Sequence, residues 1–289
     1  MTSLALIDPV ALHPAQVAGP VVQGVMSGCF SMEMTSAEYH SLPDSVSCSG
    51  LKKLLRSPAH YQAYLAQEFD EDDDNIGTAT HCALLEPDRF AQEYVVYDGY
   101  KRGKEWTEFK EQNAGKVVLN KVDYDQVMGM CSALMNHKEF PVWKAINSSR
   151  REMSVFWTDE ETGVQCRVRL DSLSAPFAIW DLKTTSDARP DAFVRQVVRL
   201  DYDLQAAMYS EAVRRFTGEH LPFIFIAVET AHPHGIWLHT AGQSMLDNGW
   251  IKFRKALHAY KTCTDNMRWP AYENAMSTLE LPRYALIAD

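Results

Sequence analysis

The stretch AIWDLKT, from Ala178 to Thr184, decides the fold of this chain of 289 residues. Because it is short and mostly apolar, it predicts a central β-strand. Asp181 and Lys183 are two residues apart, so on a strand both side chains point to one face, roughly 6.6 Å apart along the strand. Trp180 and Leu182 then face the opposite way, into packing. Charges on a central strand are costly unless they are paired or bound to a metal, so the stretch predicts a buried salt bridge or a metal site.

Other predicted strands flank this one in the sequence. Residues 153–157 and 164–173 alternate in polarity, and the turn DEETG (Asp159 to Gly163) joins them into a hairpin. A buried strand at 223–228 and a return strand at 235–239 follow. The order strand, strand, strand, helix, strand predicts an α/β (α+β) domain with a central mixed sheet flanked by helices.

Caps and helical spacing predict the helices of this domain. They are expected at 47–65 with a break at Pro58, from Thr78 to Pro87, at 120–144 with the apolar stripe Val122, Val127, Met130, Leu134 and Met135, from Pro190 to Gly218, and at 244–260. Residues 1–45 are weakly patterned and predict an extended N-terminal arm. Residues 46–289 are then a single domain that includes the C-terminal helix and tail.

The composition is that of an ordinary soluble protein. Hydrophobic residues make up 46% and charged residues 23%, which excludes a disordered chain. The apolar runs are far shorter than the ~20 residues that span a bilayer, and no basic segment precedes an apolar one at the N-terminus. We therefore expect a cytoplasmic protein that does not bind membranes. The cysteines show no C-x-x-C spacing and predict buried free thiols: Cys29, Cys48, Cys82, Cys131, Cys166 and Cys263.

The net charge of -10 argues against a protein whose whole surface binds nucleic acid. It leaves room for a basic groove on an acidic body, because steering depends on the local field. Six of the seven residues from Glu68 to Asp74 are acidic, and this run predicts a solvated loop.

Further polar residues could join the pair on the central strand. Asp171 ends the preceding strand, where a short connection brings its carboxylate beside Asp181. Two converging carboxylates repel each other unless one is protonated or a divalent ion lies between them, and hard oxygen ligands suit Mg²⁺ or Mn²⁺. His81 lies in GTATH near a helix start, and Gln205 and Tyr209 share one helix face. Taken singly, each of these last three is more typical of a core contact.

Together these residues form an ordered set of motifs. The order is G-x-x-x-H (77–81), Asp171, D-x-K (181–183) and Q-x-x-x-Y (205–209). This order resembles the RecB-like branch of the PD-(D/E)XK nuclease superfamily. The segments GLKKLLRSPAHYQAYL, GTATHCALLEP, WDLKTT and DYDLQAAMY look more narrowly like phage and prophage RecE-type exonucleases, over roughly residues 45 to 285.

The resemblance implies an activity and a set of roles. It implies Mg²⁺-dependent 5′ to 3′ hydrolysis of one strand of linear double-stranded DNA, by a homo-oligomeric ring (trimer or tetramer) that works beside a single-strand annealing recombinase. Asp171, Asp181 and Lys183 are the expected catalytic residues, assisted by Gln205 and Tyr209. The metal ligands are expected to be His81, Asp171, Asp181 and the backbone carbonyl of Leu182.

The chain also departs from its relatives. Asp171 follows Leu170 rather than a proline, as is usual in this branch, and the cysteines offer no iron–sulfur site of the kind that some relatives have. Some relatives supply a further acidic residue, for which Glu86 and Glu152 are both open candidates here.

Basic residues before the motifs are candidates for DNA contacts. They form two groups: Lys52, Lys53 and Arg56 on an early helix, and Lys101, Arg102 and Lys104 ahead of Trp106. Any one of them alone is more typical of a solvated surface cation, whereas as groups they are candidate phosphate contacts, with Arg56 the first choice for a terminal 5′-phosphate.

Two other functions stay open at this point. One is a single-strand or structure-specific DNA nuclease that uses the same metal site. The other is a catalytically inactive DNA-binding module, which the presence of Asp171, Asp181 and Lys183 disfavours.

Overall fold

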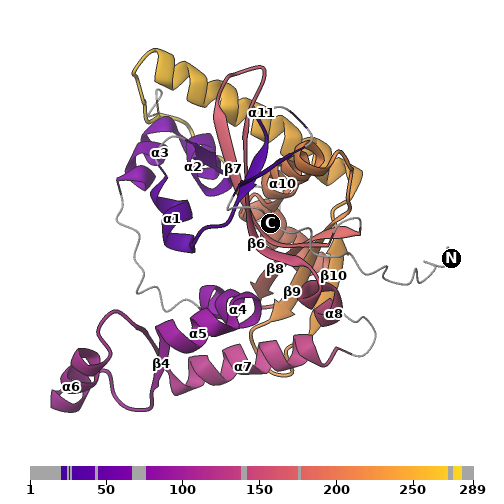
Figure 1. Cartoon of the computed structure of the whole chain (residues 1–289). Coiled ribbons are helices and arrows are strands. Elements are labelled where there is room, and N and C mark those ends of the chain that lie inside the picture. The colour runs from indigo at the N-terminus through magenta and orange to yellow at the C-terminus, as the bar shows by residue number, and fades with distance from the viewer. Residues whose placement is uncertain are drawn as a thin grey trace, which may run out of the picture.

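A mixed sheet of eight strands runs through the part of the chain that the structure describes (Figure 1). The structure is a computed structural model and describes residues 21–24, 26, 28–42, 45–66, 76–137, 142–174, 177–272 and 276–281. The strand order is β1-β2-β6-β7-β8-β9-β10, with β3 paired to β7. The strands are β1 (Val21–Gln23), β2 (Phe30–Met32), β3 (Val46–Ser47), β6 (Arg150–Thr158), β7 (Gln165–Ser174), β8 (Ala178–Thr185), β9 (Phe223–Glu229) and β10 (Ile236–Thr240).

Strand β8, which contains AIWDLKT, is central as predicted. It pairs antiparallel with β7 and parallel with β9. Ile179 packs into a core on one face of the sheet and Leu182 into a second core on the other, as the two-residue period of a strand requires. The predicted fold class, a mixed sheet flanked by helices, is confirmed.

Helices cover both faces of this sheet, with α11 at the top and α7 at the bottom of Figure 1. A separate small sheet pairs β4 (Tyr94–Tyr97) with β5 (Val117–Asn120). The helices are α1 (Ser36–Ser41), α2 (Cys48–Arg56), α3 (Pro58–Leu65), α4 (Ile76–Leu85), α5 (Pro87–Glu93), α6 (Lys104–Gln112), α7 (Lys121–Met135), α8 (Val142–Asn147), α9 (Pro190–Arg199), α10 (Tyr202–Thr217) and α11 (Gln243–Asp265).

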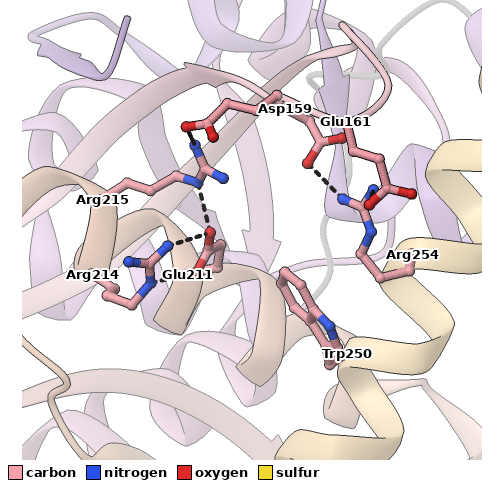
Figure 2. Close-up of a pocket in the computed structure, with 8 residues that line it drawn as sticks. Asp159, Glu161, Glu211, Arg214, Arg215, Trp250 and Arg254 are labelled. Carbon is pink, nitrogen blue, oxygen red and sulfur yellow. Dashed lines mark hydrogen bonds and ion pairs between the residues drawn. The ribbon is translucent and has the colours of Figure 1, made fainter. Parts of the chain in front are cut away.

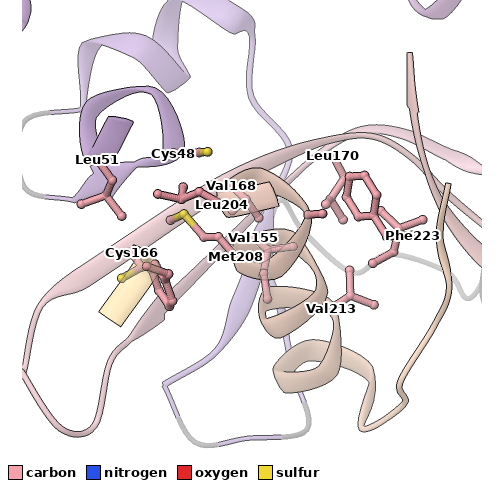
Figure 3. Packing of buried hydrophobic residues seen from close by; sticks show 14 of the residues in the cluster. Cys48, Leu51, Val155, Cys166, Val168, Leu170, Leu204, Met208, Val213 and Phe223 are labelled. Atoms are coloured by element: carbon pink, nitrogen blue, oxygen red, sulfur yellow. The ribbon is translucent and has the colours of Figure 1, made fainter. Parts of the chain in front are cut away.

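The larger core lies between the sheet and helices α2, α9, α10 and α11. Figure 3 shows Leu51 of α2 and Leu204 and Met208 of α10 close to strand residues such as Val155 and Val168. The smaller core joins α4 and α7 to the opposite face. Both layers are buried through apolar contact, which is the main force that holds such a domain together.

The helix predicted from Pro190 to Gly218 is in fact two helices. It breaks between Arg199 and Tyr202, where Asp201 has a left-handed backbone with φ 50°. A left-handed residue cannot continue a right-handed helix. Apolar spacing did not show the break, because residues on both sides of it face the same core.

The apolar stripe predicted over 120–144 is only partly right. Helix α7 ends at Met135, and Val127, Met130 and Leu134 are buried in the smaller core. Val122 is 67% exposed and Met135 45% exposed, because the buried face of the helix runs through Val127, Met130 and Leu134 and leaves both of them outside it.

Part of the predicted N-terminal arm belongs to the sheet. Strand β1 pairs with β2, and β2 pairs with β6. Thr35 and Glu38 then form a capping box at the start of α1. Residues 1–20 lie outside the described residues, so the division into arm and domain stays a prediction.

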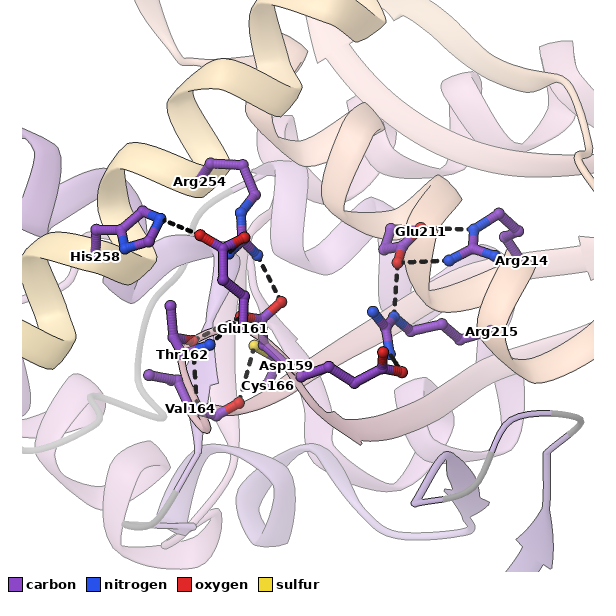
Figure 4. A network of polar contacts seen from close by, with 11 residues as sticks. Asp159, Glu161, Thr162, Val164, Cys166, Glu211, Arg214, Arg215, Arg254 and His258 are labelled. Atoms are coloured by element: carbon purple, nitrogen blue, oxygen red, sulfur yellow. Dashed lines mark hydrogen bonds and ion pairs between the residues drawn. The ribbon is translucent and has the colours of Figure 1, made fainter.

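The β6–β7 turn is fixed by a network of ion pairs (Figures 2 and 4). Arg254 of α11 pairs with Asp159 at 2.5 Å and with Glu161 at 2.6 Å, and Arg215 of α10 pairs with Glu211 at 2.6 Å. These groups line a cavity of about 440 Å³. Because each arginine of the cavity already has carboxylate partners, we interpret the network as a structural tie between the hairpin and two helices.

Smaller features of the chain complete the description of the fold. All six cysteines are buried free thiols, as predicted. Trp269, after α11, stacks on Tyr61 with ring centroids 5.5 Å apart, so the first residues of the tail pack against α3. No helix within the described ranges is long and apolar enough to cross a bilayer. The acidic run from Glu68 to Asp74 lies outside the described residues.

Candidate active site

The charged pair on β8 forms the centre of the site. Asp181 is 1% exposed, and the Lys183 Nζ lies 2.5 Å from its Oδ2. Gln205 of α10 donates its Nε2 to Asp181 Oδ1 at 2.7 Å. A buried carboxylate is therefore held from two sides, by an ammonium on its own strand and by an amide on the facing helix.

Asp171 lies beside this pair, as the sequence predicted. The β7–β8 register joins Ser172 to Trp180, which brings the next residues of the two strands together. The Leu182 amide donates to Asp171 Oδ2 at 2.8 Å. The geometry therefore brings both predicted carboxylates to one place on the sheet.

His81 reaches this place from the other side, on α4. Its Nε2 donates to the Leu182 carbonyl at 2.8 Å, since a carbonyl oxygen can only accept. Its Nδ1 is 3.5 Å from Asp171 Oδ2. Burial lowers the pKa of His81, and the positive charge of Lys183 lowers it further, so the imidazole is neutral at pH 7 and Nδ1 is an acceptor. Two acceptor atoms thus face each other across a gap that suits a cation.

Burial controls the charges of the site. It raises the pKa of Asp181 to about 6, although Lys183 works against this shift. Burial likewise raises the pKa of Asp171. At Lys183 burial works to lower the pKa, but the carboxylates of Asp181 and Asp171 outweigh it and the pKa rises. The ion pair with Asp181 thus keeps Lys183 charged. The raised pKa values of Asp171 and Asp181 mean that both acids bind a proton more readily than a free aspartate does.

Tyr209 lies one turn after Gln205 on the same helix. Its ring packs edge-on against Phe223, with centroids 6.3 Å apart. Burial raises its pKa well above the usual value, and the charges of Asp181 and Asp171 add to the shift. The predicted Q-x-x-x-Y pair therefore reaches the site from α10, the glutamine by a direct hydrogen bond and the tyrosine as a neutral phenol.

Glu152 is the acidic residue that the sequence left undecided. On β6 the pairs Arg151–Ser172 and Met153–Leu170 flank it, so Glu152 lies opposite Asp171. Its backbone is left-handed, with φ 52°, a strained conformation of the kind that clusters at functional sites. Burial raises its pKa to about 7, and the charge of Asp171 contributes.

The other candidate, Glu86, lies further out. It pairs with Arg89 at 3.0 Å and lies 3.7 Å from Arg169. Arg169 also donates to Glu152 at 2.5 Å, so one arginine joins the two acids. Of the two, Glu152 is the one that faces Asp171 across the ladder, and its negative charge acts to raise the pKa of His81.

The predicted DNA-contact residues do not all lie together. Lys52 is partly buried near Lys183, with its Nζ 5.1 Å from the Tyr202 ring centroid. Lys53 and Arg56 are exposed on α2, and Arg56 donates to the Tyr272 hydroxyl at 3.3 Å.

The second predicted group is exposed near α6 and is made up of Lys101, Arg102 and Lys104. Figure 1 shows α6 at the end of a projection well away from α2. Lys101 lies 6.0 Å from the Trp106 ring centroid and donates to the Val118 carbonyl. The structure therefore brings only Lys52 of the six cations into the site.

The donor set fits a hard divalent cation. Two carboxylates, an imidazole and a carbonyl converge, and Asp181 Oδ2 is buried with the ion pair to Lys183 but no hydrogen bond of good geometry. As they stand, no three His, Cys, Asp or Glu side chains among the described residues form a ready metal cage. The groups that would hold such an ion are His81, Asp171, Asp181 and the Leu182 carbonyl, beside the Lys183 ammonium.

This arrangement is that of the PD-(D/E)XK nuclease superfamily: a D-x-K strand between an antiparallel and a parallel neighbour, with a second acid from the preceding strand. The chain belongs to the family described as PDDEXK-like domain of unknown function (DUF3799), which it matches over residues 47–280.

A solved structure has the same fold. The chain resembles a protein from Eubacterium rectale described as a "Putative exonuclease", with a TM-score of 0.59 and 19% sequence identity, over 87% of this chain and 96% of that one. At this identity the likeness establishes the fold alone. A search of curated proteins finds no match.

Proposed function

We propose that the protein is a metal-dependent 5′ to 3′ exonuclease that degrades one strand of linear double-stranded DNA and leaves 3′ single-stranded overhangs for recombination by strand annealing. The observation that carries the nuclease assignment is the joint placement of Asp171, Asp181, Lys183 and Gln205 around one buried point on β8. The family match supports a nuclease, and the resemblance of the motifs to RecE-type enzymes supports the direction of cleavage.

Hydrolysis of a phosphodiester needs a water oxygen to bond to phosphorus while one P–O bond breaks. Mg²⁺ (or Mn²⁺), bound by His81, Asp171, Asp181 and the Leu182 carbonyl, would polarise the phosphate and lower the pKa of the attacking water. Lys183 supplies a fixed positive charge to the water or to a nonbridging oxygen.

The helix α10 keeps these groups in place. The Gln205 amide fixes one oxygen of Asp181 and leaves the other toward Lys183. Tyr209, a neutral phenol next to the two acids, can orient the water or the phosphate by a hydrogen bond.

The same resemblance supports the rest of the proposal. It adds a ring of three or four copies that encloses the duplex and a single-strand annealing recombinase as partner. A ring with a basic channel would reconcile DNA cleavage with a net charge of -10.

The test is digestion of a linear duplex labelled at either the 5′ or the 3′ end, with Mg²⁺ or with EDTA, and with covalently closed circular DNA as the control. We expect early release of the 5′ label that needs Mg²⁺, with the circles intact. Cut circles would instead identify an endonuclease. Salt-sensitive binding without any cleavage would identify a DNA-binding module and contradict the metal site.

A further inference from the structure

Two lysines from distant parts of the chain meet at one aromatic ring. Lys52 Nζ of α2 lies 5.1 Å from the centroid of the Tyr202 ring, and Lys183 Nζ of β8 lies 5.0 Å from the same centroid. A cation over an aromatic face is attracted to the ring quadrupole. The ring therefore brings together two positive charges that would otherwise repel each other.

Lys183 has a carboxylate partner, whereas Lys52 has none among the described residues. The nearest acids are engaged elsewhere: Asp181 pairs with Lys183, and Asp201 pairs with Lys252 at 2.6 Å. Burial lowers the pKa of Lys52, and the charge of Lys183 contributes to that shift. An ammonium held away from water without an anion is costly, so this position calls for an anionic partner.

The Tyr202 ring is itself held in a fixed place. Gln196 of α9 donates to the Tyr202 hydroxyl at 3.3 Å and to the Thr184 carbonyl of β8 at 3.1 Å. The ring also stacks on Phe225 of β9, with centroids 5.9 Å apart. Tyr202 is thus tied to the strand that carries Lys183 and can set the position of both ammonium groups.

We propose that Lys52 and Lys183, placed by Tyr202, form one anion site for a backbone phosphate of the DNA strand beside Asp181, with Tyr202 as a positioning residue. This rests on the proposed function for the identity of the anion. Lys52 then contributes to binding of the DNA strand at the catalytic centre itself, and Lys53 and Arg56, exposed on the same helix, do not share this role.

The experiment compares Lys52→Met and Lys255→Met with the parent protein. Lys255 is an exposed lysine of α11 and controls for the loss of one charge. Binding of a fluorescent duplex oligonucleotide is measured by anisotropy in EDTA over a range of salt concentrations. We expect Lys52→Met to weaken binding about tenfold and to lower the salt slope by about one, because one phosphate contact is lost. Lys255→Met should change neither quantity by more than about twofold.

Thermal melting without DNA separates this role from a structural one. Since Lys52 is partly buried and has no carboxylate partner among the described residues, we expect the melting temperature of Lys52→Met at or above that of the parent. A Lys52→Met protein that binds DNA with the parental affinity and salt slope would overturn the proposal. If Lys52→Met binds DNA more weakly but the parent protein shows no Mg²⁺-dependent cleavage, the anion site is supported and the proposed nuclease activity is contradicted.

Tyr202 gives the second arm of the test. Tyr202→Phe keeps the ring and should bind DNA nearly as well as the parent. Tyr202→Leu removes the ring and should show most of the loss of DNA affinity that Lys52→Met shows. In the double variant the two losses should not add, because both act on one site. Fully additive losses would contradict a positioning role for Tyr202.

Discussion

Glu152 shows how the site combines strain and like charge at a single residue. It has a left-handed backbone, lies opposite Asp171 and has a pKa raised to about 7. Each of these features lowers the stability of the fold. The neighbouring strands and the hydrogen bond from Arg169 keep Glu152 in this conformation. Such costs are typical of residues that are kept for function rather than for folding.

We predict that Glu152→Gln raises the Mg²⁺ concentration needed for half-maximal cleavage about tenfold, since a negative charge beside the proposed metal ligand Asp171 is lost. Binding of Mn²⁺ followed by calorimetry should weaken in parallel. The melting temperature in EDTA should be unchanged or higher, because repulsion of Asp171 is relieved. Glu86→Gln is the matched control, and a larger metal effect from Glu86 would reverse the assignment.

Single residues of the site were predictable where spacing sets the geometry. Asp181 and Lys183 could be placed from a two-residue period, and Asp171 from the short connection between two strands. Glu152 could not be chosen, because its place opposite Asp171 depends on the register of β6 and β7 and on a positive φ that the sequence does not show. Tyr202 was missed because its role depends on two lysines brought together by tertiary contacts.

At the scale of elements, the crossing of α10 and α11 depends on one glycine. A Cβ atom at Gly249 would lie 1.9 Å from the Asp203 carbonyl oxygen, so the backbones of the two helices approach each other closely at this point. No side chain larger than hydrogen fits without a shift of one helix.

Gly249→Ala should therefore destabilise the fold by about 1–3 kcal/mol, the usual cost of overpacking. Gly242→Ala is the control, because a Cβ there meets nothing within 4 Å and φ is -77°. Urea unfolding followed by circular dichroism measures both. Equal stability of the two variants would show that α10 and α11 do not pack this closely.

Helix α1 gives a pH-dependent contribution to stability. Burial lowers the pKa of His40 to about 4, and Arg167 and Arg169 add to the shift. The unfolded chain, with a value near 6.5, then binds more protons than the folded one, so stability falls as pH falls from about 6.5 toward 4. His40→Gln should show a smaller fall over this range in urea midpoints measured against the parent. If His40→Gln and the parent show the same dependence of stability on pH, the His40 side chain is exposed to solvent and the prediction is wrong.

The elements themselves were predicted unevenly. Strong periodicity identified the hairpin and α11, because each has one face against the larger core. Strands β8 and β9 were identified as short apolar runs, because both of their faces are buried. The break between α9 and α10 left no mark in the apolar spacing, and the small β4–β5 sheet was missed because four-residue strands carry too few alternations.

For the whole molecule, the fold class follows from the order of the elements, and the function follows from where they meet. Strands β7 and β8 bring Asp171 and Asp181 beside Lys183, and we propose that a metal ion and a phosphate complete this site. The oligomeric state depends on surfaces between copies, which a single sequence pattern does not specify.

We predict that light scattering of the full chain gives a mass three or four times 32.7 kDa. A closed ring would keep the enzyme on one DNA molecule, so release of nucleotides should continue after excess unlabelled competitor DNA is added. A monomeric mass together with immediate arrest by competitor would contradict the ring.

The most direct measurement of the central claim compares the parent with Lys183→Ala on an end-labelled linear duplex in Mg²⁺. We predict that cleavage falls by several orders of magnitude, while circular dichroism shows a retained fold and DNA binding weakens at most about tenfold. A folded Lys183→Ala protein that cleaves DNA at the parental rate would contradict the assignment of the β8 site as the catalytic centre.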